Sequence, residues 1–311
     1  MFSNSERGVR KTIAYIFLLS LLLSIKSSAQ WFTQNSGTTN RLNSVYFLNP
    51  DTGFVAGATG TILKTTDGGG NWDLVSPGPP NAFNALVFPN DSTGYAFGTA
   101  MLILKTTDGG ANWFSLNFGG DVLNFFSANF TNDSTGYAVG ISGTESRIVK
   151  TTDAGNNWTV QSFDSITTLY SIHFPTVDTG YAVGLTNFEE APILKTTDAG
   201  NSWFSQASGV GQSLRSVYFT SANIGYAVGT SGTILKTING GNTWMTIDLG
   251  PGITPTLSSV FFPDATTGYA ASEFYLNDGI LKTTNAGAIW TFQNSVTSEP
   301  LNDLFFVDTN I

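Results

Sequence analysis

After residue 30, short apolar runs alternate with stretches rich in Gly, Asn, Asp, Ser and Thr. Apolar runs of about five residues bounded by such stretches are typical of short β-strands joined by turns. No stretch after residue 30 has apolar residues at a sustained helical spacing. The pattern therefore predicts an all-β chain.

Four kinds of run follow one another in a fixed order. "LRSVYF" at Leu214–Phe219 precedes "GYAVG" at Gly225–Gly229 and "TILKT" at Thr233–Thr237, and a fourth run begins at a Trp, as at Trp203. This order recurs six times. Repeats of about 40–45 residues with four short strands predict the four-stranded antiparallel blades of a β-propeller.

Two further segments match parts of a blade. "WFTQNSG" at Trp31–Gly37 matches a fourth strand, and "LNDLFF" at Leu301–Phe306 matches a first strand. Propellers avoid an open sheet edge when an N-terminal strand completes the last blade. We therefore expect six complete repeats plus a partial seventh, a seven-bladed design in a chain truncated at its C-terminus, with residues 31–37 in the last blade. The alternative, a complete six-bladed ring, leaves both segments without a place.

The stretch "KTTDGGGNW" at Lys64–Trp72 recurs in every unit, with Lys and Trp eight residues apart. The Asp side chain can accept hydrogen bonds from backbone N–H groups of its own turn. The Gly two residues later can adopt a positive φ, and the Trp can bury a large ring. A loop needed in every unit is typical of a structural turn rather than of a catalytic site.

Two copies of this turn have Asn in place of Asp, at Asn239 and Asn285. Asn keeps the oxygen acceptor but has no charge, and a calcium site depends on anionic oxygens. We therefore expect neither a metal site nor a phosphate site in these turns. The residues predicted to be structural are Asp67, Trp72, Asp108, Trp113, Asp153, Trp158, Asp198, Trp203, Asn239, Trp244, Asn285 and Trp290.

The N-terminus has the organisation of a signal peptide. Basic residues precede an apolar run of 14 residues from Thr12 to Ile25, and Ser27, Ser28 and Ala29 supply small residues before a cleavage point at Gln30. An uncleaved anchor is the alternative, but a bilayer span needs about 20 residues. We predict a signal peptide at 1–29 and one propeller domain at 30–311. The protein would be periplasmic, cell-surface or extracellular, without a transmembrane span after cleavage.

The charge argues against nucleic acid as a partner. The chain has 22 Asp and Glu against 13 Lys and Arg; without residues 1–29, the formal charge changes from −9 to −12. An acidic surface repels phosphate backbones. The sequence has no Cys, which excludes disulfides, thiolate metal sites and a Cys nucleophile. We expect no metal and no cofactor.

Loop lengths separate two faces of the predicted ring. The Gly of the second strand follows the last Phe of the first strand by six positions in all six units, and the Lys–Trp spacing is also constant. The second-to-third-strand connection and the link to the next unit vary in length. Because successive antiparallel strands place alternate turns at opposite ends, both variable connections lie on one face. Exposed variable loops collect binding groups.

The enlarged loops are residues 141–147, 185–192 and 272–279. They place aromatic side chains beside acidic ones, a combination that suits protein partners. The alternative is ordinary solvated loops whose aromatic rings fold back onto the blade. The candidate binding residues are Glu145, Arg147, Phe188, Glu189, Glu190, Glu273, Phe274, Tyr275 and Asp278.

Two other residue types invite a functional interpretation. His173, the only histidine, shares its first-strand position with aromatic and aliphatic residues in other units, which favours packing between blades over catalysis. The Lys before each turn recurs once per unit. We expect each Lys to lay its stem over the sheet and to pair with a nearby acid.

The turn pattern Ser/Thr-x-Asp-x-Gly-x-x-Trp is the Asp-box, or BNR repeat. With its "GYAVG" and "ILKT" strands, the chain from residue 31 to 311 resembles the photosystem II stability and assembly factor-like propellers. The resemblance implies a β-propeller that acts as a non-enzymatic assembly scaffold for a protein partner. Asp-boxes also occur in sialidases, sortilin-type receptors and xyloglucan-degrading enzymes, so the motif alone specifies fold better than function.

The sequence leaves three possible functions to compare. The first is a protein-binding scaffold that uses the variable-loop face. The second is a glycoside hydrolase, but the sialidase arginine triad is not matched by Arg41, Arg147 and Arg215, and Glu189–Glu190 are neighbours rather than an opposed pair. The third is a cell-surface module with affinity for carbohydrate. We expect no enzymatic activity and assign no catalytic residue.

Overall fold

The computed structural model describes residues 31–77, 79–116, 118, 123–163, 166, 168–185, 190–273, 279–295, 297 and 299–308. Its strands form six four-stranded antiparallel sheets, which confirms the predicted all-β fold and its six blades. The predicted signal peptide lies outside the described residues. Within the described ranges, no helix has the length and apolar character needed to cross a membrane.

The first three blades have the following strands. Blade one contains β1 (Leu42–Phe47), β2 (Gly53–Gly57), β3 (Thr61–Thr65) and β4 (Asp73–Pro77), with the 3₁₀ helix η1 (Ala58–Gly60). Blade two contains β5 (Phe83–Val87), β6 (Gly94–Gly98), β7 (Ile103–Thr106) and β8 (Phe114–Leu116). Blade three contains β9 (Asn124–Phe130), β10 (Gly136–Ser142), β11 (Glu145–Thr151) and β12 (Thr159–Phe163).

The other three blades follow the same order. Blade four contains β13 (Thr168–His173), β14 (Gly180–Leu185), β15 (Ile193–Thr196) and β16 (Phe204–Gln206). Blade five contains β17 (Leu214–Phe219), β18 (Gly225–Gly229), β19 (Ile234–Thr237) and β20 (Met245–Thr246), with η2 (Thr230–Gly232). Blade six contains β21 (Leu257–Phe261), β22 (Gly268–Ser272), β23 (Ile280–Thr283) and β24 (Thr291–Gln293).

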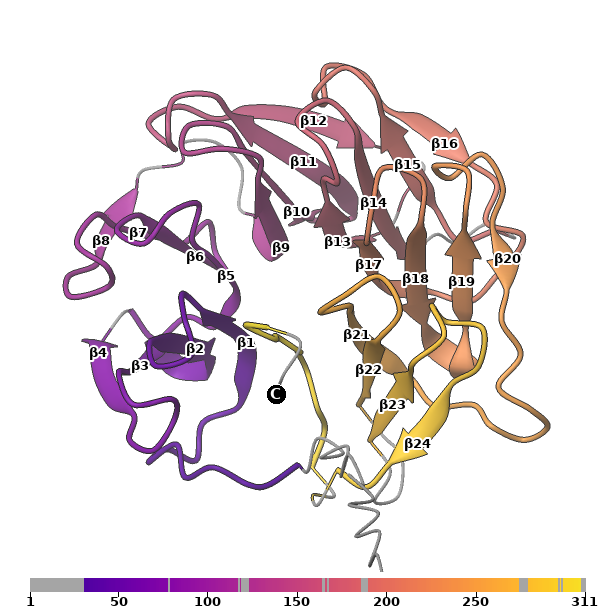
Figure 1. Cartoon of the computed structure of the whole chain (residues 1–311). Coiled ribbons are helices and arrows are strands. Elements are labelled where there is room, and N and C mark those ends of the chain that lie inside the picture. The colour runs from indigo at the N-terminus through magenta and orange to yellow at the C-terminus, as the bar shows by residue number, and fades with distance from the viewer. Residues whose placement is uncertain are drawn as a thin grey trace, which may run out of the picture. The chain divides into compact units, whose positions relative to one another are not determined.

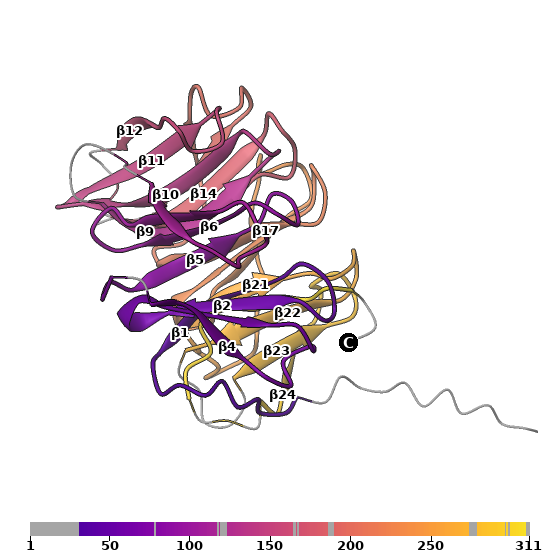
Figure 2. The same cartoon turned by 90° about the vertical axis from the view of Figure 1, so that its left-hand side faces the viewer.

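The blades are arranged around a central axis (Figure 1). The first strand of each blade lies innermost and the fourth lies outermost, and Figure 2 shows the blades from the side. The yellow segment that follows β24 runs between β21 and β1 (Figure 1). This segment includes residues 301–306, which contain no assigned strand, and residues 31–37 also contain none.

The second strand of each blade is covered on both faces. All five residues of β18 are buried, as expected for a sheet that packs against neighbours on each side. The glycine that begins this strand is required by packing within the blade, because a Cβ at Gly225 would lie 2.5 Å from the ring of Phe219. Only glycine avoids that clash, which explains why every second strand begins with it.

Adjacent blades meet through three aromatic rings, which we call the aromatic triad. Between blades five and six, Tyr226 stacks on Phe262 at 4.0 Å, and Trp290 packs edge-on against Phe262 at 5.8 Å. Tyr137 with Phe174 and Trp203 repeats the arrangement. Aromatic pairs at such distances add about 0.5–1.5 kcal/mol to the stabilisation that burial itself provides. The triads therefore hold one blade against the next.

The Asp-box turn is closed by its own hydrogen bonds. Asp67 Oδ1 accepts from Thr65 Oγ1 at 2.8 Å and from the Asn71 backbone N–H at 2.9 Å. The same turn at Asn239 keeps the acceptor, with the Thr243 backbone N–H at 3.0 Å. Hydrogen bonds from the backbone and side chain of Asn112 lower the pKa of Asp108 to about 2. These bonds give the Asp-box side chain its partners within its own turn.

The repeated Lys has a different partner from the one expected. Lys105 Nζ donates to the backbone carbonyl of Ala154 at 2.8 Å, and the Tyr95 hydroxyl donates to the same oxygen at 2.8 Å. Ala154 belongs to the Asp-box turn of the next blade. Lys64, Lys195 and Lys236 likewise donate to turn carbonyls of the following blade. The prediction of local pairing with an acid is wrong, because the Lys bridges two blades.

The segments at the two ends of the propeller meet each other. Phe306 stacks on Tyr269 of β22 at 4.4 Å, and Trp31 packs edge-on against Phe306 at 5.9 Å. These three rings have the arrangement of the aromatic triad. This sixth triad, after the five between consecutive blades, joins residues from opposite ends of the chain next to blade six.

Candidate functional site

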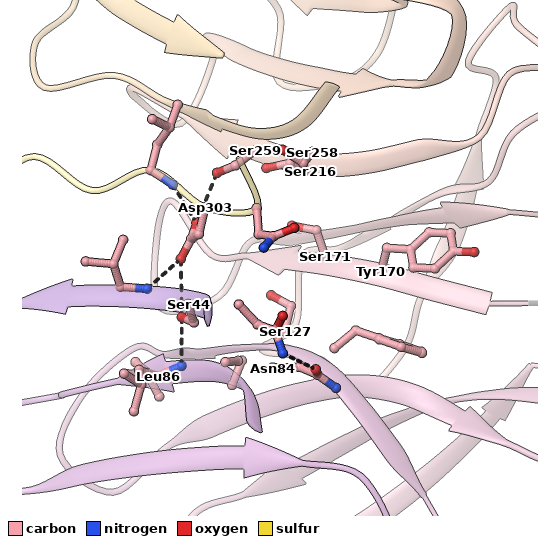
Figure 3. Close-up of a pocket in the computed structure, with 18 of the residues that line it drawn as sticks. Ser44, Asn84, Leu86, Ser127, Tyr170, Ser171, Ser216, Ser258, Ser259 and Asp303 are labelled. Atoms are coloured by element: carbon pink, nitrogen blue, oxygen red, sulfur yellow. Dashed lines mark hydrogen bonds between the residues drawn. The ribbon is translucent and has the colours of Figure 1, made fainter. Parts of the chain in front are cut away.

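The first strands enclose a polar cavity of about 300 Å³ on the ring axis. A serine occupies the third position of the "LRSVYF" motif in five of the six units, and these serines converge on the cavity in Figure 3. Four of these Ser hydroxyls accept a hydrogen bond from the first strand of a neighbouring blade: Ser44 from Leu86 N at 3.1 Å, Ser127 from Ile172 N at 3.3 Å, Ser171 from Val217 N at 3.2 Å and Ser216 from Val260 N at 3.2 Å. The serines therefore tie the inner strands together.

Asp303 continues this series between blade six and blade one (Figure 3). Its Oδ2 accepts from Val45 N at 3.1 Å and Ser44 Oγ at 3.2 Å. Its Oδ1 accepts from Ser259 Oγ at 3.1 Å and Leu304 N at 2.9 Å. Burial raises the pKa of Asp303, and these hydrogen bonds act in the opposite direction. The carboxylate links β21 to β1.

Asparagines form a second ring of contacts beside the serines. Asn302 Nδ2 donates to the Leu42 carbonyl at 2.6 Å, Asn43 Nδ2 to Phe83 at 2.9 Å and Asn84 Nδ2 to Phe125 at 2.8 Å. Each asparagine thus bonds to the backbone that precedes the equivalent position in the next strand. These contacts link the segment at Asn302 with β1, β5 and β9 in one register.

The rest of this ring is aromatic and cationic. The Arg215 guanidinium lies 4.4 Å from the ring centre of Tyr170, and Tyr170 packs edge-on against Phe126 at 5.6 Å. Arg215 Nε is buried and has no hydrogen-bond partner among the described residues. On the other side, Arg41 Nη2 donates to Asn302 Oδ1 at 2.6 Å.

These groups surround a hollow of about 160 Å³, which we call the channel mouth. Its residues are Arg41, Asn43, Asn84, Phe126, Tyr170, Arg215, Ser258, Glu273 and Asn302. Two guanidinium groups, one carboxylate, amides and two aromatic faces can hold an extended polar segment, because each kind of group recognises a different part of a peptide.

Four of the nine predicted binding residues lie among the described residues, and one of these four lines the channel mouth. Glu273 lines the channel mouth. Arg147 forms an ion pair with Glu145 on β11, and Glu190 is exposed just before β15. The other five predicted residues lie outside the described residues: Phe188, Glu189, Phe274, Tyr275 and Asp278.

Sequence reasoning missed most of the channel mouth. Phe126, Tyr170 and Arg215 occupy the second position of the "LRSVYF" motif, between positions that vary little. One feature of the sequence indicates this site. The second motif position changes its chemistry from unit to unit, whereas the positions on either side of it repeat. The sequence suggests for Arg41 only the comparison with a sialidase triad, and the structure places it with Arg215 among the residues that line the mouth.

His173 lines the polar cavity of about 300 Å³ on the ring axis but is not among the residues of the channel mouth. Its ring packs against Tyr218 of the next blade at 4.9 Å, as expected for a residue between blades. Burial lowers the pKa of His173 to about 4, and a hydrogen bond with the Phe219 backbone acts in the opposite direction. The imidazole is neutral near pH 7.

The repeats, turns and blades described above match one protein family. The sequence model of the family described as "Photosynthesis system II assembly factor YCF48" matches residues 23–124 and 156–303, which is most of the chain. The chain belongs to this family. No curated protein matches the chain in sequence.

Solved structures share the fold at low identity. A structure of YCF48 bound to D1 peptide has a TM-score of 0.69 and 17% identity, and covers 89% of this chain and 93% of its own. YCF48 from Cyanidioschyzon merolae has a TM-score of 0.70 and 17% identity, with coverages of 88% and 90%. A GH74 xyloglucanase from Xanthomonas campestris has a TM-score of 0.64 and 15% identity, covering 85% of this chain and 46% of its own.

Proposed function

We propose that the protein is a non-enzymatic scaffold that binds an extended protein segment at the channel mouth. The observation that carries this proposal is the grouping of Arg215, Tyr170 and Phe126 in one hollow, with a buried Nε that lacks a partner among the described residues. A guanidinium supported by an aromatic ring and open to a ligand is typical of protein-binding hot spots.

The position of the mouth also supports binding on the variable-loop face. Glu273 follows the second strand of blade six directly, at the start of an enlarged loop. Arg41 lies in the link that leads into β1. Both variable connections therefore reach this end of the ring, where different units can contribute different side chains.

Charge favours a partner segment that carries carboxylates. The whole chain has a formal charge of −9, yet the mouth brings two arginines together around one glutamate. A local positive site on an acidic protein steers an acidic segment to that site and repels it elsewhere. The solved YCF48 relative binds a peptide from D1, which is consistent with a peptide ligand for this family.

The test uses a photoreactive benzoylphenylalanine at position 126, with the same residue at position 114 as control. Phe114 is also aromatic, but it is exposed on the outer strand β8. We expect crosslinks to one partner from position 126, and we expect Arg215→Ala to weaken capture about tenfold, as for a hot-spot residue. Arg147→Ala, which removes an ion-paired arginine away from the mouth, should leave capture unchanged. Equal crosslinking from both positions would overturn the proposal.

Hydrolysis is the alternative function for an Asp-box propeller, and the xyloglucanase shares only the fold. A glycosidase of the usual kind needs two opposed carboxyl groups about 5–10 Å apart. Of the described acids, Glu273 is at the mouth, and Asp303 is held by four hydrogen bonds within the ring. Turnover of any chromogenic glycoside, abolished by Glu273→Gln, would refute the non-enzymatic assignment.

We further propose that the protein is exported and that its ring has seven positions. The charged and apolar pattern of residues 1–29 supports export, and N-terminal sequencing of the mature protein should begin at Gln30. The triad of Tyr269, Phe306 and Trp31 and the bonds of Asp303 support a seventh position.

A further inference from the structure

The first strands of all six blades carry a β-bulge at the second motif position. In blade five the pairing of β17 with β18 shifts between Leu214 and Ser216, so Arg215 has no opposite residue. The same shift occurs in the other five blades. A bulge takes its extra residue out of the ladder and re-aims the side chain. Arg215 and Ser216 can therefore both line the polar cavity on the ring axis, which we call the axial cavity.

The serines at the third motif position differ in how their hydroxyl hydrogens are used. The hydroxyls of Ser44 and Ser259 donate to Asp303. The other three hydroxyls accept a backbone N–H from the neighbouring blade, and no described residue accepts a hydrogen bond from them. They belong to Ser127, Ser171 and Ser216 (Figure 3). Because a hydroxyl has a donor hydrogen besides its acceptor lone pairs, these three can still donate to a ligand.

Arg215 supplies a fourth donor. Its side chain lines both the axial cavity and the channel mouth, and its buried Nε–H has no partner among the described residues. A carboxylate has two oxygens with about four acceptor sites, which matches three hydroxyls and one guanidinium N–H. A buried donor without an acceptor is unfavourable, so a ligand that accepts from all four donors gains affinity.

Asp303 shows how a carboxyl group is held by these serines. One of its oxygens accepts from Ser44 on β1 and the other from Ser259 on β21. Among the described residues that line the axial cavity, it is the only acidic one, and each of its oxygens already has two donors. The serines of blades three to five offer the same kind of contact to a carboxylate from outside the ring.

We infer that the axial cavity binds one carboxylate of the partner segment, held by Arg215 and by the three hydroxyls of blades three, four and five. The inference deepens the proposed function and rests on it, because the segment reaches the cavity through the channel mouth. The cavity volume of about 300 Å³ equals that of roughly ten water molecules. An acidic side chain or a carboxyl terminus therefore fits inside.

The experiment titrates the full chain with acetate and measures saturation transfer to the acetate methyl group by NMR. Acetamide has a similar shape without the charge and is the control ligand. We expect saturable acetate binding at about millimolar concentration, as for so small a ligand, and about tenfold weaker binding of acetamide. Equal binding of acetate and acetamide, or no saturable binding of acetate, would overturn the inference.

Matched serine variants locate the acetate. Ser171→Ala removes a backbone acceptor and an unused hydroxyl hydrogen, and should weaken acetate binding about tenfold, the effect of losing one hydrogen bond to a charged group. Ser44→Ala also removes a backbone acceptor, but its hydroxyl hydrogen is already used by Asp303, so affinity should not change. Alanine is compatible with the ring, because Ala85 occupies this position in blade two. Equal effects of the two substitutions would contradict the inference.

Two short peptides distinguish the possible sources of the carboxylate. Acetylated triglycine with a free carboxyl terminus presents a chain end, and glycyl-aspartyl-glycine blocked at both ends presents a side chain. We expect at least one of them to bind more tightly than acetate, because its backbone also reaches the channel mouth. Affinities of both peptides that Ser171→Ala leaves unchanged would overturn the inference.

Failure of this inference differs measurably from failure of the proposed function. Crosslinks from position 126 to one partner, without acetate binding, would remove the inference and leave the proposed function in place. Acetate binding that Ser171→Ala weakens, without any crosslinked partner, would support the carboxylate site and count against the scaffold function.

Discussion

The blade junctions and the channel mouth are built from the same first strands but differ in how their side chains vary. At the junctions, a Phe at the end of the first strand or directly after it stacks on the preceding blade in blades two to six, and the turns repeat almost without change. At the mouth, the second position changes from Asn to Phe, Tyr, Arg and Ser between units. Repetition marks the interactions that build the ring, and variation marks the surface left for recognition.

The largest effect is expected at a junction. Phe262→Ala removes the ring that contacts both Tyr226 and Trp290, so the free energy of unfolding should fall by about 3–5 kcal/mol. Chemical denaturation measures the change. Phe114→Ala, at an exposed outer position, is the control and should change stability by less than about 0.5 kcal/mol. A similar decrease in the free energy of unfolding in both variants would show that the aromatic triads at the junctions do not stabilise the ring.

Asp303 provides the next test, because it sits at the only junction without a complete neighbour among the described blades. Asp303→Ala leaves the Val45 N–H and two hydroxyls without their acceptor, which should cost about 1–3 kcal/mol. Ser171→Ala removes one equivalent acceptor and should cost less. The comparison fails if both substitutions cost the same.

The pH dependence of Asp303 has a definite sign. Because its pKa is raised on folding, its contribution to stability is complete below the ordinary carboxyl pKa and is lost as pH rises through the folded value. Asp303→Asn should remove this loss, so the stability difference between variant and wild type should shift in favour of the variant as pH rises. Denaturation curves at several pH values check this.

At the mouth, substitution should affect binding and leave stability nearly unchanged. Tyr170→Ala removes the ring under Arg215 and should weaken partner binding about fivefold to tenfold, the value of a cation–π support plus orientation. Titration with the identified partner measures it, and circular dichroism monitors the fold. A large loss of stability with unchanged affinity would place Tyr170 among the structural residues.

His173 should give the smallest effect near neutral pH. Its pKa of about 4 in the folded state is below the ordinary 6.5, so stability is lost as pH falls between these values. His173→Phe should remove that loss while leaving stability near pH 7 unchanged, since Phe261 occupies the same position in blade six. Parallel acid titrations of the two proteins compare them.

The strands were predictable because their residues repeat. The expected runs at Leu214–Phe219 and Gly225–Gly229 coincide with β17 and β18. The partner of each Lys was not predictable, because the acceptor is a backbone carbonyl about 45–50 residues away and carbonyls leave no mark in a sequence. The channel mouth could not be predicted without knowing which side of each first strand faces the axis. Arg215 and Phe126 also belong to no recognisable binding motif.

The bond between Asp303 and Ser44 joins residues that are 259 positions apart in the chain. Contacts of such long range form late in folding, since the entropy of bringing distant parts together must be overcome first. We therefore expect the individual blades to assemble in sequence and this carboxylate to engage only once the last inner segment has arrived beside the first. The hydrogen bond between the Ser44 hydroxyl and the Asp303 carboxyl group would then form last, after the inner strands of all six blades are in place.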